Sequence, residues 1–219
     1  MPEARDIWYD FGAHAIKRGM YAMNSRDGVY LEWINYWAYA MAGNFIPFLD
    51  LFRNATGMNT FDYFRHLEKE KYFLLYTMMP GGHNSLNMGE TTSSLYIPSP
   101  LWPIRTTMLK AASEYQDSEA QGLADYCSQL GIKPYGKRGR LTWWDPFTGD
   151  AYRTLLWWDP TVKPVDPRTK WPSYHHFTDF DMVCIRSSWD DDATHFALRC
   201  GPPAGQRATQ LFYKEKLPD

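Results

Sequence analysis

The fold of this 219-residue chain is decided by one stretch near its end, MVCIRSSWDDDATHFALRC, residues 182–200. Two runs in it, Met182–Ser187 and Thr194–Cys200, combine apolar, aromatic and β-branched residues at alternating positions. The polar segment Trp189–Ala193 separates them, and this arrangement is typical of a β-hairpin. A third run of the same kind, Tyr174–Phe177, comes just before. The sequence therefore predicts the strands of a small antiparallel sheet.

Side chains on the predicted hairpin alternate between its two faces. Its apolar face carries Val183, Ile185, Phe196 and Leu198. Pairing the strands through this face places Cys184 and Cys200 on opposite sides of the sheet, so we expect no disulfide between them. The third cysteine, Cys127, forms no metal-binding spacing with the other two.

The predicted sheet is too small to be stable alone, because two or three strands with one apolar face are marginal in water. Gly201–Asp219 offers at most one more short strand, around Leu211–Tyr213. We therefore expect the sheet to be completed by a partner, such as a second copy of the chain, or by the remainder of a longer protein.

The first half of the chain has helical spacing of its apolar residues. Helices are expected at Ile7–Met23, Tyr30–Met41, Ile46–Asn54, Phe61–Met79 and Pro103–Leu130. Gly43-Asn44 is expected to separate the second from the third, and Gly131 to end the last. The predicted class is α+β, mainly α. Its parts are a helical part in residues 1–131, a Trp/Pro-rich linker in 132–172, and the start of an antiparallel β-sheet domain in 173–219.

Charge and composition exclude some partners and leave others open. The 23 Lys and Arg residues nearly balance the 25 Asp and Glu residues, which argues against a nucleic-acid partner bound through a broad basic field. No stretch is apolar enough to span a membrane, so no membrane partner is expected. The first residues do not form a signal peptide. Aromatic residues make up 17 % of the chain, and such rings fill cores or stack on flat ligands and sugars.

The common catalytic signatures are missing from the sequence. It contains no Gly-rich phosphate loop, no Gly-x-Ser-x-Gly, no His-Glu-x-x-His and no Cys-x-x-Cys. Redox, phosphoryl-transfer and common metalloprotease functions therefore have no support from motifs.

The second predicted helix carries a carboxylate beside aromatic rings. Glu32, Tyr36 and Tyr39 lie at i, i+4 and i+7 and share one helix face, and Trp33 and Trp37 form an adjacent stripe. A groove of this kind suits a sugar, because the acid accepts hydrogen bonds from hydroxyls while the rings stack. The alternative is that Glu32 is solvated and the rings belong to the core.

The end of the fourth predicted helix leads into a loop that carries proton-transfer residue types. Tyr76 is followed by the Gly-flanked pair His83-Asn84. An Asn or His can neutralise a carboxylate and make the neighbouring carbon acidic, and a Tyr or His can then move the proton. The alternative is a polar surface loop. Farther on, His175 and His176 point to opposite faces of a strand and cannot chelate one metal together.

These segments, in this order, resemble the heparinase II/III-like polysaccharide lyases. The resemblance rests on Asp27-Gly28-Val29-Tyr30-Leu31-Glu32 with Tyr36-Trp37-Ala38-Tyr39, the loop from Pro80-Gly81-Gly82 to Met88-Gly89-Glu90, Leu156-Trp157-Trp158-Asp159-Pro160, His176-Phe177, Arg186-Ser187-Ser188-Trp189, and Ala197-Leu198-Arg199-Cys200-Gly201-Pro202. It implies an (α/α) toroid followed by antiparallel sheets, and β-elimination of uronic-acid-containing polysaccharides. It also implies a periplasmic or extracellular parent protein.

The resemblance assigns roles to several residues. It implies catalytic roles for Glu32, Tyr76, His83 and Asn84. Substrate-binding roles fall to Tyr30, Trp33, Tyr36, Trp37 and His176, and Tyr30 is the only polar residue at the position of the family's carboxylate neutraliser. The family's His-x-His-x-Asp segment, which assists catalysis and holds a structural metal, does not occur in this sequence.

Three functions follow as hypotheses from these observations. The first is a fragment of a lyase that acts on an acidic polysaccharide and is incomplete as a catalyst. The second is a non-catalytic carbohydrate-binding or scaffold module that uses the aromatic groove. The third is a helical interaction domain whose rings are core. No cofactor is expected within this chain, although the resemblance implies a structural zinc or calcium ion in full-length family members.

Overall fold

The computed structural model of the chain describes Gly19, Met20 and residues 22–82, 85–86, 101–130, 151–202 and 205–213. Its helical elements are α3 (Trp33–Tyr36), the π-helix η2 (Trp37–Phe45), α4 (Ile46–Thr56), α5 (Thr60–Tyr63), α6 (Leu67–Tyr76), α7 (Leu101–Tyr115), α8 (Ser118–Leu130), α10 (Ala151–Trp157), the 3₁₀-helix η3 (Pro167–Thr169) and α11 (Gly205–Tyr213). The strands are β1 (Tyr174–Phe177), β2 (Met182–Arg186) and β3 (His195–Arg199). Most of the helix predicted at Ile7–Met23 lies outside the described residues.

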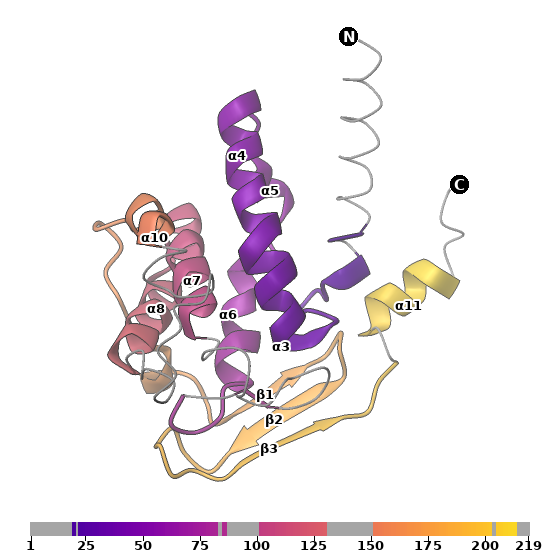
Figure 1. Ribbon diagram of the computed structural model, residues 1–219. Coiled ribbons are helices and arrows are strands. Elements are labelled where there is room, and N and C mark those ends of the chain that lie inside the picture. The colour runs from indigo at the N-terminus through magenta and orange to yellow at the C-terminus, as the bar shows by residue number, and fades with distance from the viewer. Residues whose placement is uncertain are drawn as a thin grey trace, which may run out of the picture.

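The helices form a layer on one side of the small sheet, and α11 lies beside it (Figure 1). The sheet has the order β1-β2-β3 and both pairs are antiparallel. The α+β class and the three strands are therefore confirmed. The short strand expected around Leu211–Tyr213 is wrong, because those residues end α11.

The predicted break at Gly43-Asn44 is wrong. The chain runs without interruption from α3 through the π-helix η2 into α4. Pro47 in the first turn of α4 lacks an N–H, and the wider η2 turn just before it accommodates this gap in the hydrogen-bond ladder. The Asn44 side chain donates to the Tyr39 carbonyl, with 2.6 Å between Nδ2 and O, and so replaces part of that ladder.

The helices predicted at Phe61–Met79 and Pro103–Leu130 are each divided in two. Residues 64–66 separate α5 from α6, and the second division turns the chain back on itself as the α7–α8 hairpin. At this turn Gln116 has a positive φ of 51°, which ends α7. Asp117 then caps α8, because its Oδ1 accepts hydrogen bonds from the N–H groups of Glu119 and Ala120 at 2.9 and 3.0 Å.

One hydrophobic core joins the helical layer and the inner face of the sheet. On that inner face Phe177, Met182 and Cys184 are buried, and Phe177 contacts Tyr76 of α6 edge-to-face at 6.5 Å between ring centroids. Cys184 is buried and Cys200 exposed, and both thiols are free. They lie on opposite sides of the sheet, as predicted.

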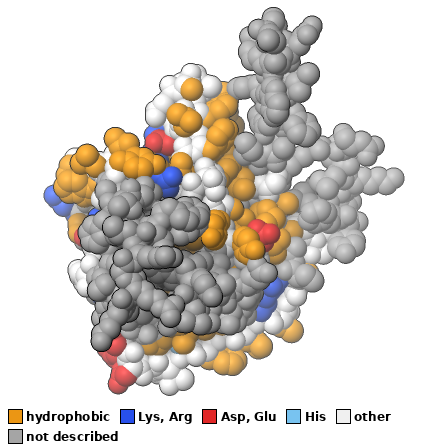
Figure 2. Space-filling view, in the orientation of Figure 1, with side chains coloured by type: hydrophobic (Ala, Val, Ile, Leu, Met, Phe, Trp, Pro, Cys, Tyr) orange, Lys and Arg blue, Asp and Glu red, His pale blue; other side chains and the backbone are white. Residues whose placement is uncertain are grey.

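The apolar face of the hairpin points away from the helices. Its exposed side chains are Tyr174, Ile185, Phe196 and Leu198, which are 46–61 % exposed. Hydrophobic side chains accordingly gather along the lower edge of the molecule, where the sheet lies (Figure 2). No helix in the described ranges is both long and apolar enough to cross a membrane.

A charged contact ties α6 to the start of α8. Lys71 is nearly buried; its ammonium group donates a short hydrogen bond to Asp117 and lies 3.3 Å from a Glu119 carboxylate oxygen. Asp117 therefore both caps α8 and neutralises a nearly buried cation. A buried charge that loses its partner is costly, so this residue supports the whole helical layer.

We expect Asp117→Ala to lower the free energy of unfolding by about 2 kcal/mol, because it removes a helix cap and the main partner of Lys71. Asp117→Asn keeps the cap and should cost about half as much. Denaturant unfolding followed by circular dichroism measures both. The control is Asp190→Ala at an exposed turn, for which we expect a change within about 0.5 kcal/mol. An Asp117→Ala variant as stable as this control would contradict the assignment.

Candidate functional site

The two tryptophans of the predicted sugar groove lie inside the protein. Trp33 is 2 % exposed and Trp37 is 0 % exposed. Their ring nitrogens donate to interior partners, Trp33 to the Leu86 carbonyl at 2.6 Å and Trp37 to Glu70 Oε2 at 2.9 Å. In this arrangement neither ring has a free face for a ligand. The tryptophan stripe is a core stripe, and the groove expected from it is not formed by these rings.

Trp33 also has an unusual backbone conformation. It begins α3 with a positive φ of 70°, which costs a bulky residue about 1–2 kcal/mol. The burial of its ring and the hydrogen bond to Leu86 hold it there. Strain of this kind is often kept next to functional residues, and the neighbouring residue is Glu32.

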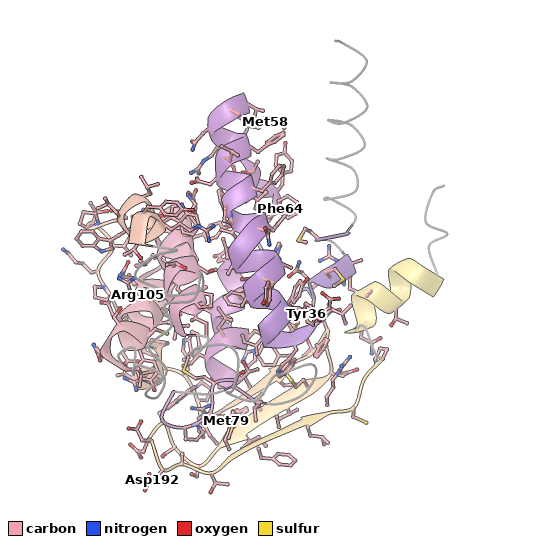
Figure 3. All side chains as sticks on the ribbon, viewed as in Figure 1. Tyr36, Met58, Phe64, Met79, Arg105 and Asp192 are labelled. Atoms are coloured by element: carbon pink, nitrogen blue, oxygen red, sulfur yellow. The ribbon has the colours of Figure 1, made fainter. Side chains whose placement is uncertain are left out.

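The acid and tyrosines of the same helix remain at the surface. Glu32 is exposed, and Tyr36 and Tyr39 are 42 % and 38 % exposed. The two rings lie 6.4 Å apart between centroids at an angle of 41°. Figure 3 shows Tyr36 near the sheet-proximal end of the helical segment whose far end leads to Met58. We call Glu32, Tyr36 and Tyr39 the acid–tyrosine ridge.

Tyr30 supports this ridge from below. Its ring is buried at 2 % exposure, and its hydroxyl donates to Glu32 Oε2 at 3.1 Å. Burial, together with the charge of Glu32, raises the pKa of the Tyr30 hydroxyl well above its ordinary value, so the group stays a donor at neutral pH. Tyr30 therefore orients the carboxylate and does not itself line an open groove.

Tyr76 is separated from solvent. It is 1 % exposed, and its hydroxyl donates to the Pro172 carbonyl at 2.7 Å. Burial raises the pKa of this hydroxyl, against an opposing effect of Arg186. The group is therefore protonated at neutral pH, which suits a proton donor and not a base.

The sheet brings His175, and not His176, to Tyr76. His175 lies on the inner face, with 4.9 Å between its ring centroid and that of Tyr76. His176 points to the outer face, where Nε2 is 4.0 Å from a carboxylate oxygen of Asp181. The expected opposite orientation of the two histidines is therefore confirmed. The substrate-binding role assigned to His176 does not place it with the other predicted site residues.

His83 and Asn84 lie outside the described residues, but the residues after them are anchored. Ser85 pairs with Met78 in an isolated β-bridge. The Leu86 N–H donates to the Thr77 carbonyl at 2.8 Å, and the Leu86 carbonyl accepts from Trp33. The described residues closest in sequence to the loop thus join the end of α6 to the start of α3.

Sequence reasoning missed an aromatic cluster between α6 and the sheet. Tyr72 stacks on Trp171 at 4.4 Å and on His175 at 5.3 Å between centroids, and Tyr76 lies 5.3 Å from Trp189. Arg186 lies 4.2 Å above the Trp189 ring. No sequence pattern indicated this cluster, because its members on α6, Tyr72 and Tyr76, come about a hundred residues before the others along the chain.

A buried acid and histidine one helical turn apart were also missed. Glu70 is fully buried, and its Oε1 is 3.6 Å from His66 Nε2. Burial raises the pKa of Glu70 to about 8, so its carboxyl is mainly protonated at pH 7. Burial and the nearby charge of Arg207 lower the pKa of His66 to about 4. The pair is therefore uncharged at neutral pH.

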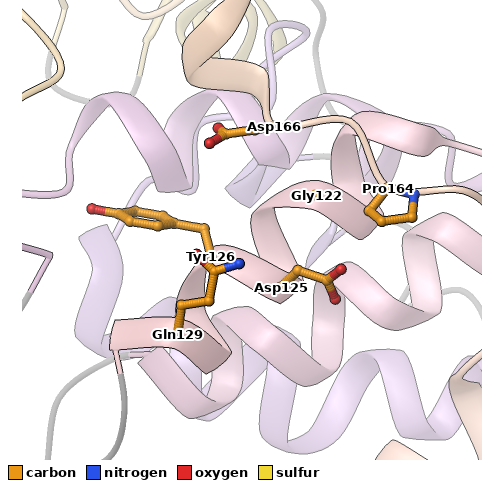
Figure 4. A pocket seen from close by; sticks show the side chains of 6 residues that line it. All are labelled: Gly122, Asp125, Tyr126, Gln129, Pro164 and Asp166. Carbon is orange, nitrogen blue, oxygen red and sulfur yellow. The ribbon is translucent and has the colours of Figure 1, made fainter.

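A small pocket of about 200 Å³ lies between α8 and the segment before η3 (Figure 4). It is lined by two carboxylates, Asp125 and Asp166, but both are already engaged. Asp166 forms an ion pair with Arg168 at 2.7 Å, and Asp125 accepts from Gln121 at 3.1 Å. Across the part of the chain that is described, no group of three or more His, Cys, Asp or Glu side chains is placed to hold a metal. This pocket offers no chemistry of its own.

We expect stability to fall as pH rises from 6.5 to 8 because of Glu70. In that window the folded carboxyl, with its pKa of about 8, retains a proton that the unfolded one, with an ordinary pKa of 4.5, has lost. The slope approaches about 1.4 kcal/mol per pH unit. Between about pH 4.5 and 6.5 the slope flattens, because unfolded His66 binds a proton that folded His66 does not bind until about pH 4, and this offsets the contribution of Glu70.

Urea unfolding of wild type and Glu70→Gln at several pH values between 6.5 and 8 tests this expectation. The Gln variant keeps an acceptor for Trp37 and should lose the slope. Glu68→Gln, on the same helix but only partly buried, is the control and should keep it. Parallel profiles for wild type and Glu70→Gln would show that Glu70 is ionised in the folded protein.

No protein-family model matches this chain, and no curated protein matches its sequence. The resemblance to heparinase II/III-like lyases rests on the quoted motifs, and the roles that it implies stay predictions. The described geometry contributes one exposed acid–tyrosine ridge, a buried tyrosine with a bound hydroxyl, and the pair Ser85 and Leu86, which joins the end of α6 to the start of α3.

Proposed function

We propose that this chain recognises a uronic-acid-containing polysaccharide along the acid–tyrosine ridge, as the substrate-binding part of a lyase that acts by β-elimination. The observation that supports this most is the pair of exposed rings, Tyr36 and Tyr39, next to a carboxylate held in place by Tyr30. Tyrosine rings at a surface offer an apolar face to a sugar ring and a polar tip to its hydroxyls.

The chemistry of the ridge fits a neutral part of the sugar and not its acid group. Glu32 is an acceptor when ionised, so it binds hydroxyl donors and repels the ligand's own carboxylates. A saccharide therefore lies with hydroxyls toward Glu32 and its acid groups turned away. Binding in this orientation depends on where the hydroxyl groups lie along the polysaccharide and not on its charge alone.

We further propose that the helical layer is part of an (α/α) toroid. Two features support it. The helices α7 and α8 form an antiparallel hairpin that packs against α6, and the helical layer covers one face of the sheet only (Figure 1). In this arrangement the ridge lies on the helical layer, and the sheet supplies His175 and Arg186 to the interface with α6.

We expect the double variant Tyr36→Ala/Tyr39→Ala to weaken binding of an acidic polysaccharide by about tenfold or more, because each stacked ring contributes on the order of 1 kcal/mol. Isothermal titration with heparin, alginate and chondroitin measures this. The matched control is Tyr152→Ala, an exposed tyrosine on α10. If wild type and the double variant have equal affinity for every polysaccharide that binds, the ridge is not the binding site.

A second candidate function is the β-elimination step itself with Tyr76 as proton donor. It is favoured by the placement of Tyr76 against His175 with Arg186 nearby. The hydroxyl is not available as observed, because Pro172 accepts its hydrogen bond. Catalysis therefore requires that the segment around Pro172 move away from the ring.

We expect no rise in ultraviolet absorbance from unsaturated uronate when the chain is incubated with heparin, alginate or chondroitin, because the Tyr76 hydroxyl is buried and bonded. Turnover that disappears in Tyr76→Phe would instead establish the second candidate. Turnover that persists in Tyr76→Phe would assign the proton transfer to another residue.

A further inference from the structure

The last strand of the sheet pairs with another strand on one side only. The strand order is β1-β2-β3, so β3 has β2 along one edge and no described strand along the other. Figure 1 shows β3 along the lower border of the molecule, with the helices above the sheet. A free strand edge is a template on which another strand can pair. We call this border the β3 edge.

The main-chain groups of β3 alternate between β2 and the β3 edge. Just beyond the strand, the N–H of Cys200 donates to the Asp181 carbonyl at 3.0 Å. Hydrogen-bonded pairs recur at every second residue of an antiparallel ladder, so Leu198 and Phe196 also turn their N–H and C=O groups toward β2. The other residues of the strand turn theirs to the β3 edge.

Three residues therefore face the β3 edge with their main-chain groups, namely His195, Ala197 and Arg199. For the main-chain groups of His195 and Ala197, the described part of the chain supplies no hydrogen-bond partner at that edge. Natural edge strands often block pairing with a Pro or a bulge, but β3 contains no Pro and its register with β2 is regular. The β3 edge is therefore open to a further strand.

The β3 edge is complementary to a copy of itself. Two antiparallel β3 strands related by a two-fold axis at Ala197 set Ala197 opposite Ala197, and His195 opposite Arg199. Each of these positions faces the β3 edge, and such pairs in an antiparallel ladder exchange two hydrogen bonds. A shift of the register by two residues leaves one of these positions without an opposite number. This symmetry favours a second copy over an unrelated strand.

The outer side chains suit the same register. It sets Phe196 of each copy opposite Leu198 of the other, at the positions where side chains across an antiparallel pair approach most closely. These two side chains are 55 % and 57 % exposed, so pairing removes apolar surface from water. In the combined sheet they lie next to Ile185 and Tyr174, which are exposed on the same face.

The inner side chains do not oppose the pairing. Ala197 is small and meets only its copy at the axis. His195 comes opposite Arg199, but burial and the charge of Arg186 lower the pKa of His195 to about 4. The imidazole is therefore neutral at pH 7, and no repulsion between like charges arises across the pair.

We propose that two copies of this chain associate through the β3 edge, in antiparallel register about Ala197, and form one continuous sheet of six strands. The two-fold axis is perpendicular to the sheet, so both helical layers lie on one side and the apolar outer face continues across the dimer. Two five-residue edges bury less than the about 1,200 Å² of a standard specific interface, so the dimer is reversible, with a dissociation constant in the micromolar range. The proposal does not depend on polysaccharide binding.

The test is sedimentation velocity of the full chain over about a hundredfold range of protein concentration, in which wild type should pass from monomer to dimer. Ala197→Pro removes an N–H that makes no bond to β2. It should weaken dimerisation about tenfold or more, because the central pair of hydrogen bonds is lost. The matched control is His176→Pro in β1, which also removes an N–H that points away from β2 and should leave dimerisation unchanged.

A second pair of variants separates edge pairing from face-to-face packing of the sheets. Leu198→Lys places a charge opposite Phe196 of the other copy and should weaken the dimer about tenfold. Ile185→Lys places the same charge on the central strand of the same face and should have a much smaller effect. Leu198 is already exposed, so this variant takes the place of Ala197→Pro if circular dichroism shows that the proline variant is unfolded.

Hydrogen exchange gives a readout at single residues. The amides of His195 and Ala197 should exchange more slowly at high than at low protein concentration, whereas the amide of His176 should not change. A wild type that stays monomeric, undiminished dimerisation in Ala197→Pro or Leu198→Lys, or an equal loss in His176→Pro would overturn the proposal. A larger loss in Ile185→Lys than in Leu198→Lys would also overturn it and would assign the association to the outer face of the sheet.

Discussion

The helix α6 is the element on which the other layers depend, and it holds them largely through polar groups on its buried faces. Glu70 accepts a hydrogen bond from Trp37 of η2, and Lys71 donates to Asp117 at the start of α8. Farther along, Tyr76 packs on the sheet and donates to a carbonyl before β1. Buried polar groups cost free energy unless they are paired, so each contact admits few alternative partners. This requirement fixes η2, α8 and the sheet relative to one helix.

Local sequence signals were sufficient for the strands but not for the ends of the helices. Alternation and a polar turn predicted β2 as Met182–Ser187, and it spans Met182–Arg186. The pair Gly43-Asn44 predicts a helix end, but the burial of Phe45 and Ile46 in the core outweighs the weak helix propensity of Gly43. The turn at Asp117 had a readable cap signal, Asp followed by Ser-Glu-Ala, which the long helical periodicity concealed.

The candidate site was predictable where it depends on one helix and not where it depends on tertiary contacts. Helical spacing placed Glu32, Tyr36 and Tyr39 on one face, and the structure exposes them together. The same spacing could not decide that the neighbouring Trp stripe faces inward, because aromatic stripes suit cores and grooves equally. The aromatic cluster between α6 and the sheet brings together Tyr72 and Trp171, which are 99 positions apart. No local pattern carries that information.

The sheet shows how burial and hydrophobicity can be uncoupled. Its inner face contains Arg186 and Arg199 beside the buried Phe177, Met182 and Cys184, and its outer face exposes apolar side chains. The inner guanidinium groups are accommodated by carbonyl acceptors, Met78 for Arg186 at 2.6 Å and Pro202 for Arg199 at 2.8 Å, and by aromatic rings beneath them. Arginine suits such a place because its planar group is weakly hydrated and stacks on rings. The inner face is therefore held by directional contacts, which specify one register against α6, whereas apolar packing alone would tolerate a shifted one.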